Sequence, residues 1–160
     1  MRPLRRSWRY SAAMKRFRFK LQVLLDQRKA REEQLQIELA QVMRDEAREL
    51  ALLCKLRRDL EAACEGIAAA LRRSASPVEL ARRDEHAKAL RDDAKVQGLT
   101  LQAVRERVVA KRVEVTEAMK ERKVLETLRD NQERAHLAEG AKVERNGLDE
   151  MASLRYAREM

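Results

Sequence analysis

Few side chains in this sequence have the chemistry of catalysis, and the two cysteines are the first to consider. Cys54 and Cys64 are ten residues apart, so in a helix they would lie about 15 Å apart along its axis. They could not form a disulfide with each other without unfolding that helix. Two thiols outside any disulfide framework fit a reducing compartment, and we expect both to be small buried hydrophobic side chains.

The remaining candidates for chemistry are histidines, paired acids and glycines. His86 and His136 lie fifty residues apart in polar stretches, with no cysteine or carboxylate cluster at metal-ligand spacing beside either. The isolated glycines begin no G-x-x-x-x-G-K phosphate loop. Three acidic pairs are typical of solvated helix surface: Glu32-Glu33, Asp92-Asp93 and Asp149-Glu150. The sequence therefore predicts a protein that is not an enzyme, with no catalytic residue, no cofactor and no metal site.

The composition indicates long helices rather than a thick globular core. The 160 residues are 39% charged and 3% aromatic, and include only four glycines and two prolines. A bias toward Ala, Glu, Lys, Leu and Arg is typical of coiled coils. Because aliphatic residues recur at helical spacing throughout, we favour helices over disorder. A rod of two helices has no interior in which catalytic groups could converge.

The net charge of +9 is concentrated at one end of the chain. Residues 21–160 contain 28 basic and 27 acidic side chains. A body so nearly balanced offers no broad basic face for duplex nucleic acid, so we do not favour nucleic acid as a partner. Residues 1–20 contain no acid and these eight bases: Arg2, Arg5, Arg6, Arg9, Lys15, Arg16, Arg18 and Lys20.

Residues 1–13 form a basic leader that allows three interpretations. An Arg-rich, acid-free stretch with serines has the composition of a mitochondrial transit peptide. It could instead be a flexible basic arm, or reflect an upstream start codon chosen in place of Met14. We favour a start at Met14, with the arm second. Since no apolar run has the length of a membrane span or of a signal-peptide core, we expect a cytoplasmic protein.

Two helical stripes flank a break near residue 75. Ser76 and Glu79 form a capping box, and Pro77 stands at the first helical position. The apolar positions of the first stripe are Leu21, Leu25, Leu35, Leu39, Val42, Leu50, Leu53, Leu60, Cys64, Ile67 and Leu71. Those of the second are Leu80, Ala87, Leu90, Ala94, Leu101, Val104, Val108, Val115, Ala118, Leu125 and Leu128.

This pattern predicts an all-α fold, a long antiparallel two-helix coiled-coil hairpin. A three-residue connection makes the helices fold back on each other, with facing residue numbers that add up to about 150. Leu39 would lie near Val108, and Leu25 near Leu125. We place helix 1 at residues 17–73, the turn at 74–76, helix 2 at 77–139 and a projecting helical extension at 140–158, all in one domain of residues 14–160.

The two ends of this predicted hairpin resemble those of the FliJ family. Residues 17–25, FRFKLQVLL, followed by Arg28 and Glu32-Glu33, are similar to the family's F-x-F-x-L-x-x-L/V-L opening. Residues 122–128, RKVLETL, followed by Glu144 and Asp149-Glu150, are similar to its closing segment. The resemblance covers nearly everything after Met14, and the basic leader departs from it.

The resemblance implies a non-enzymatic stalk of the bacterial flagellar type III protein export apparatus, and so a role in motility. Such a stalk would insert its helices into the hexameric export ATPase FliI and connect that ring to the membrane gate protein FlhA, with export chaperones as further partners. It would be peripheral to the cytoplasmic face of the inner membrane, associate with the membrane indirectly, and be a monomer in isolation. By the same analogy, the residues expected to contact partners are Arg16, Phe17, Arg18, Phe19, Lys20, Arg28, Arg31, Arg122, Lys123 and Arg129.

Other interpretations of the same residues stay open. The chain could be the equivalent stalk of a virulence type III secretion system, or a dimeric coiled-coil tether. It could also be a basic-armed coiled coil that binds nucleic acid, with Trp8 and Tyr10 available for stacking. For the proposed contact residues, the alternative is that the aromatic side chains cap the hairpin core and the basic groups are solvated.

Overall fold

The computed structural model describes residues 16–159, and the predicted leader, residues 1–13, lies outside them. Two helices account for nearly all of the described chain: α1, Gln22–Arg72, and α2, Pro77–Glu159. The chain divides into two compact units. The hairpin unit is Lys29–Lys120, and the terminal unit contributes residues 16–28 and 121–159 to the described part. The predicted all-α, two-helix hairpin is confirmed.

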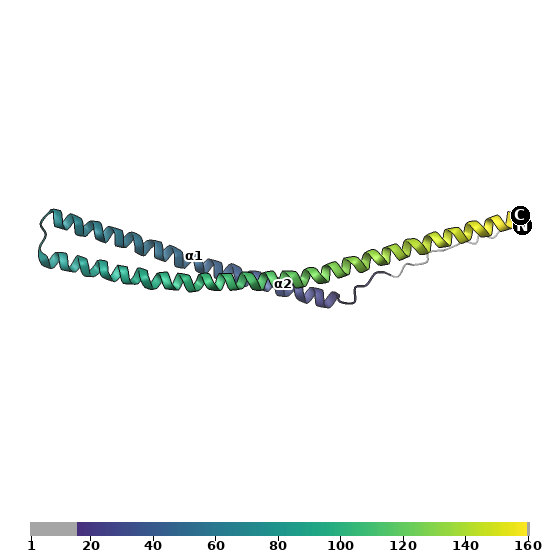
Figure 1. The fold of residues 1–160 in the computed structure, drawn as a ribbon, viewed down its shortest axis with the longest axis horizontal. Helices are drawn as coiled ribbons and strands as arrows, with labels where there is room; N and C mark the ends of the chain where they lie inside the picture. The colour runs from purple at the N-terminus through teal and green to yellow at the C-terminus, as the bar shows by residue number, and fades with distance from the viewer. Residues whose placement is uncertain (1–15, 160) are drawn as a thin grey trace, which may run out of the picture. The chain divides into compact units, whose positions relative to one another are not determined.

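In the hairpin unit, α1 and α2 run antiparallel and side by side (Figure 1). Buried and half-buried residues recur on both helices in steps that alternate between three and four. This spacing is the heptad repeat of a left-handed coiled coil, in which one narrow seam of each helix faces its partner. On α1 these positions are 32, 35, 39, 42, 46, 49, 53, 56, 60, 63, 67 and 70. On α2 they are 80, 83, 87, 90, 94, 97, 101, 104, 108, 111, 115 and 118.

The contacts between the helices confirm the predicted register. Val42 packs with Val104 and Val108 in a buried cluster, against which Leu39 lies half-buried. Two ion pairs flank this cluster. Arg105 Nε donates to Glu46 Oε1 at 3.1 Å, and Lys111 Nζ lies 2.8 Å from Glu38 Oε2. The residue numbers of both pairs add up to about 150, as a short turn between antiparallel helices requires.

The seam also contains a polar layer near its middle. Gln97 is buried at a seam position and donates through Nε2 to Glu49 Oε2 at 2.6 Å and to the Glu49 carbonyl oxygen at 3.1 Å. Glu32, another seam residue, is buried as well. Polar groups at such positions lower stability but favour one alignment of the helices over others.

Part of the predicted stripe is wrong. Leu50 is 40% exposed and Leu71 is 59% exposed, whereas the seam passes through Glu49 and Ala70. The cysteines are a second error, since both thiols are free and exposed rather than buried. Cys64 has this exposure because the strict heptad runs through Ala63 instead.

The α1 helix ends in a Schellman motif at Ser74, which has a positive φ of 55°. The Ala75 N–H donates to the Ala70 carbonyl at 3.0 Å, and the Ser74 N–H donates to the Leu71 carbonyl at 3.1 Å. These are the two bonds by which the motif satisfies the last carbonyls of a helix. The chain therefore reverses direction over a few residues without leaving these helix-end carbonyls unpaired.

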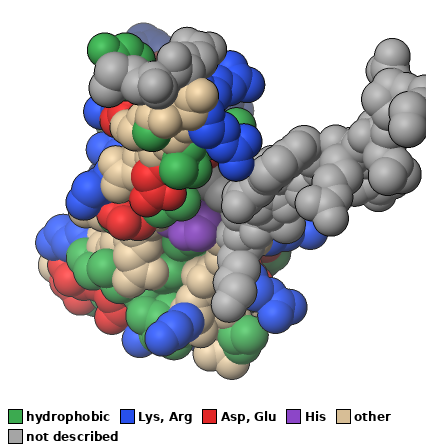
Figure 2. Space-filling view, turned by 90° about the vertical axis from the view of Figure 1, so that its right-hand side faces the viewer, with side chains coloured by type: hydrophobic (Ala, Val, Ile, Leu, Met, Phe, Trp, Pro, Cys, Tyr) green, Lys and Arg blue, Asp and Glu red, His purple; other side chains and the backbone are tan. Residues whose placement is uncertain are grey.

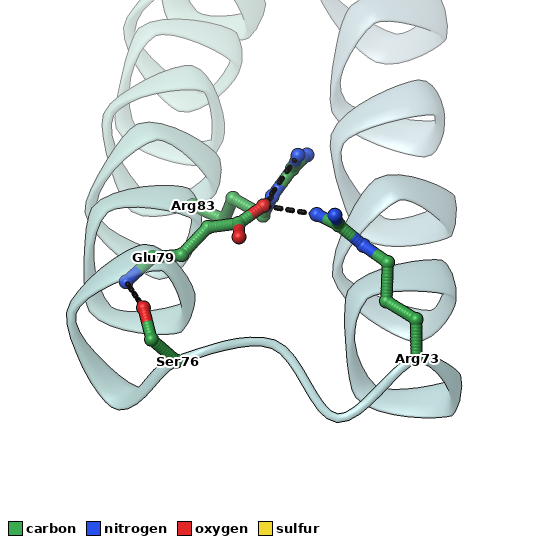
Figure 3. A network of polar contacts seen from close by, with 4 residues as sticks. All are labelled: Arg73, Ser76, Glu79 and Arg83. Carbon is green, nitrogen blue, oxygen red and sulfur yellow. Dashed lines mark hydrogen bonds and ion pairs between the residues drawn. The ribbon is translucent and has the colours of Figure 1, made fainter.

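The α2 helix begins with half of the predicted capping box. The Glu79 N–H donates to Ser76 Oγ at 3.2 Å, as expected for an N-cap serine. The Glu79 carboxylate turns instead to two arginines (Figure 3). Arg83 donates to it from Nε at 3.0 Å and from Nη2 at 2.9 Å, and Arg73, the residue after the end of α1, completes the network. Glu79 thus links the two helices across the turn.

The terminal unit contains the first turns of α1 and the second part of α2. Its buried apolar residues are Phe19 and Leu25, and Leu25 is fully buried. Residues 16–19 lie outside the helix, which begins at Gln22 rather than near residue 17 as predicted. The α2 helix continues through residue 140 without interruption to Glu159, and every side chain from 141 to 158 is exposed.

Candidate functional site

The segment before α1 holds half of the residues predicted to contact partners. Exposure alternates along it: Phe17 is half-buried and Phe19 is buried, while Arg16, Arg18 and Lys20 are exposed. Side chains two residues apart share a face in extended backbone but not in a helix. The non-helical backbone of this segment therefore lets both phenylalanines turn inward while its cations face outward.

The two phenylalanines pack inside the terminal unit. The ring of Phe17 lies 5.8 Å from the imidazole of His136 on α2, centroid to centroid, with the planes tilted by 42°. The Phe19 carbonyl accepts a hydrogen bond from the Gln22 N–H at 3.2 Å, which joins the segment to the first turn of α1. This geometry supports the alternative that the aromatic side chains close the hairpin core.

Three of the predicted basic residues are held in ion pairs within the terminal unit. Arg28 on α1 pairs with Glu121 on α2. Arg122 pairs with Glu126, and Arg129 with Asp130. Each of these guanidinium groups has a carboxylate within hydrogen-bonding distance. A partner protein would have to compete with these acids for them.

The other predicted cations are differently placed. Lys123 is exposed on α2, and Arg31 is exposed on α1 but belongs to the hairpin unit. Neither residue makes an ion pair or hydrogen bond with another described residue. The structure therefore brings together Arg16 through Lys20 as one segment, places Arg28 against α2, and leaves Arg31 outside that unit.

Sequence reasoning missed His136 and the acidic partners of the arginines. His136 was placed in a polar stretch and given no role, but it is half-buried against Phe17. No apolar pattern marked it, because Arg122 and Arg129 occupy the positions fourteen and seven residues before it, and only the structure shows these positions as half-buried in steps of seven. The pairing of Arg28 with Glu121 does follow from the register, once the sum of about 150 is applied beyond the apolar positions.

The described residues show neither a metal site nor a membrane span. Residues 16–159 contain no group of three or more His, Cys, Asp or Glu side chains that could hold a metal ion. Among the described helices, none is long and apolar enough to cross a membrane. The described residues do present two packed helices and, before α1, a segment whose basic side chains are exposed.

A heptad seam, a short capped turn and a charged exterior define the class of antiparallel two-helix coiled coils. Residues 17–160 match the family model described as Flagellar FliJ protein. The chain therefore belongs to the FliJ family, as the resemblance of its two ends indicated, and family membership makes it a flagellar export protein. The comparison with curated proteins gave no significant match. The comparison with solved structures gave none either.

Proposed function

We propose that this chain is the non-enzymatic stalk of the flagellar export apparatus, coupling the hexameric export ATPase to the membrane export gate at the cytoplasmic face of the inner membrane. The observation that carries the proposal is the unbroken heptad seam of the hairpin unit in a chain that matches the family over residues 17–160. The flagellar description of the family favours this role over the virulence stalk. Export chaperones are proposed as additional partners.

The dimensions and surface of the hairpin unit support a role as a connector. The 44 residues of α1 in this unit correspond to roughly 65 Å of helix at 1.5 Å per residue. Two helices joined along a continuous seam resist bending better than one. On the face that Figure 2 shows, which looks onto the end of the molecule that carries the C-terminal part of α2, basic, acidic and hydrophobic side chains lie beside one another. Such mixed surfaces suit polar and reversible contacts with a protein pore.

The exposed cations are the strongest candidates for contacts with the ATPase. Arg16, Arg18, Lys20 and Lys123 are exposed and make no ion pair with another described residue. By contrast, Arg28, Arg122 and Arg129 are already paired with carboxylates. Binding through the first group would not require an internal ion pair to break, so it would cost less.

The proposed role is tested by mixing the full chain with its cognate export ATPase. We expect the two to co-migrate in gel filtration and the ATPase rate to rise. Replacing Arg16, Arg18 and Lys20 together by glutamine should weaken both effects. The matched control replaces Lys55, Arg57 and Arg58, three exposed cations of the hairpin unit, by glutamine and removes the same charge. Absence of both association and stimulation would overturn the proposal and leave the fold untouched.

A second variant separates packing from recognition at the aromatic pair. Replacing Phe17 and Phe19 together by alanine should lower the melting temperature, because Phe19 is buried and Phe17 packs against His136. If ATPase binding falls only as far as folding does, the rings serve the core. A loss of binding by a variant that remains fully folded would make them contact residues.

A further inference from the structure

The hairpin unit carries a second apolar stripe on α1, beside the seam. Its positions are again three and four residues apart, and each follows a seam position by one residue: Ala40, Met43, Ala47, Leu50 and Cys54. All five side chains are exposed, Met43 by 43% and Leu50 by 40%. On a helix that packs against a single partner, residues outside the seam are ordinarily polar. The stripe therefore has the spacing of a helix-packing face but stays exposed in the described chain.

Polar residues limit this stripe at both ends. The next positions of the same series are Gln36 and Arg57, so the apolar run spans residues 40–54, about 21 Å of helix. Two alanines and a cysteine alternate with the larger Met43 and Leu50 along it, so large side chains of a neighbouring helix could fit between these two. One narrow row of this kind fits one helix, whereas a membrane surface takes up a broad apolar face.

Gly98 on α2 leaves space beside this stripe. Arg105 of α2 reaches Glu46 of α1 at 3.1 Å, and Gly98 lies one heptad from Arg105 toward the turn, so it shares that face of α2 and is level with Leu50. No atom of α1 lies within 4 Å of the point where a β-carbon of residue 98 would stand, and the backbone there has no positive φ. Glycine weakens a helix interior, and the packing of the hairpin does not require it at this position. It does leave room for another backbone to approach closely.

The free charges beside the stripe are positive. The three acidic side chains between residues 40 and 54 are half-buried and already engaged within the hairpin. Asp45 pairs with Arg48, Glu46 pairs with Arg105, and Glu49 accepts from Gln97. By contrast, the exposed side chains of Arg44 on α1 and of Lys95 and Arg112 on α2 make no ion pair or hydrogen bond with another described residue. Acidic side chains on an approaching helix would therefore be favoured.

We propose that residues 40–54 of α1 dock an acidic amphipathic helix of a partner protein, which packs as a third helix beside α1 and α2. Its apolar side chains would pack around Met43 and Leu50, and its carboxylates would meet the free cations. Recognition of a helix through anchors three and four residues apart is a common mode of binding. The site goes beyond the proposed stalk role. It lies in the hairpin unit, requires neither the ATPase nor the gate, and uses none of the cations proposed to contact the ATPase.

The test uses a synthetic helix and the full chain. The probe is a fluorescent, chemically stapled peptide of about two heptads, with leucine and alanine alternating in its seam and glutamate on both flanks. Fluorescence anisotropy should show saturable binding that weakens at least about tenfold when lysine replaces the glutamates. Bound peptide should also slow the alkylation of Cys54, which lies in the stripe, more than that of Cys64, ten residues farther along α1.

The substitution Gly98→Leu separates docking from folding. Leucine is a better helix former than glycine and finds open space here, so the melting temperature should not fall. Its side chain should block the approach of the peptide and weaken binding about tenfold or more. The matched control is Gly147→Leu, where an added β-carbon also meets no atom within 4 Å, and it should leave binding unchanged. Replacing the exposed Arg44, Lys95 and Arg112 together by glutamine should weaken binding of the acidic peptide about tenfold without unfolding the chain.

Several outcomes would overturn the proposal. These are equal binding of the acidic and basic peptides, equal weakening by the two glycine substitutions, and protection of Cys64 as strong as that of Cys54. A dimer of the chain alone that Gly98→Leu dissociates would assign the face to a second copy instead. Tighter binding of anionic vesicles or of an oligonucleotide than of the acidic peptide, at the same salt, would assign it to a lipid surface or to nucleic acid.

Discussion

Ser74 occupies a backbone conformation that costs serine free energy. Its φ of 55° lies in the left-handed region, where a side chain crowds the following carbonyl and where helix ends most often carry glycine. Replacing Ser74 by glycine should therefore raise the free energy of unfolding by about 0.5–1 kcal/mol, after allowance for the greater freedom of glycine in the unfolded chain. Urea titration followed by circular dichroism measures the change.

The matched variant at this position is Ser74→Val. A β-branched side chain is less tolerant of positive φ than serine, so valine should lower stability. If valine were as stable as serine while glycine gave no gain, the left-handed conformation would not be the origin of the cost.

Glu79 makes the turn sensitive to acid. Hydrogen bonds from Arg83 are the main cause that lowers the pKa of this carboxyl below its ordinary value of 4.5, with Arg73 contributing further. A group whose pKa is lower in the folded state stabilises that state above the ordinary pKa, and loses this effect as the pH falls through the lowered value. The stability difference between the native chain and Glu79→Gln should therefore shrink as the pH decreases below about 4.5.

Unfolding of both chains between pH 7 and pH 2 would show this convergence. The arginines keep their charge throughout this range, so within this network the charge changes only at the Glu79 carboxyl. Because other carboxylates change together with Glu79, the difference between the two chains is the informative quantity. A difference that stays constant with pH would mean that the ion pairs at the turn contribute nothing.

At the scale of the helix, the heptad seam buries one of two neighbouring leucines and leaves the other exposed. Leu53 is 5% exposed at a seam position, whereas Leu52, its neighbour on α1, is 45% exposed. Leu53→Ala should lower the free energy of unfolding by about 2–4 kcal/mol through lost burial and a cavity. Leu52→Ala should change it by less than about 0.5 kcal/mol. Comparable effects of the two substitutions in urea titrations would place the seam elsewhere.

The sequence was sufficient to predict both helices and their register, but not every seam position. Large residues at steps of three and four suggested Leu50 and Leu71, whereas the structure uses Glu49 and Ala70. Supercoiling keeps one strict heptad face toward the partner, and a series of the largest apolar residues drifts away from that face. Ala70 is buried because a small side chain lets the helices approach closely beside the turn.

The partner contacts stay a prediction, and the conformation of the segment that holds half of them could not be predicted from the sequence. The predicted helix 1 includes residues 17–21. In a helix Phe17 and Phe19 would point in different directions, since residues two apart do not share a helix face. The observed segment is not helical, and the burial of Phe19 together with the half-burial of Phe17 accompanies that conformation. The periodicity of the sequence could not predict this non-helical segment, because Phe17 packs against His136, a residue far along the chain on α2.

For the whole molecule, we propose that the isolated chain is a monomer, since α1 and α2 already supply a seam to each other. Light scattering should then give a mass near 18.6 kDa, independent of concentration. The exposed thiols of Cys54 and Cys64 call for a reducing agent in this measurement, because disulfides between chains would mimic association. A stable mass of twice this value under reducing conditions would favour the dimeric tether.

The heptad positions of α1 and α2 face each other in pairs on the two sides of one turn. This pairing also restricts how the hairpin can change its length in evolution. Seven residues inserted into one helix alone, close to the turn, would shift the register of every facing pair farther from the turn by one heptad. Gln97 and Glu49 would then no longer face each other. Seven residues inserted into both helices, at opposite points, would keep every pair together. The reach of this protein can therefore grow or shrink only in paired increments of about 10 Å, so lineages with differently spaced machinery should differ by whole heptads in both arms.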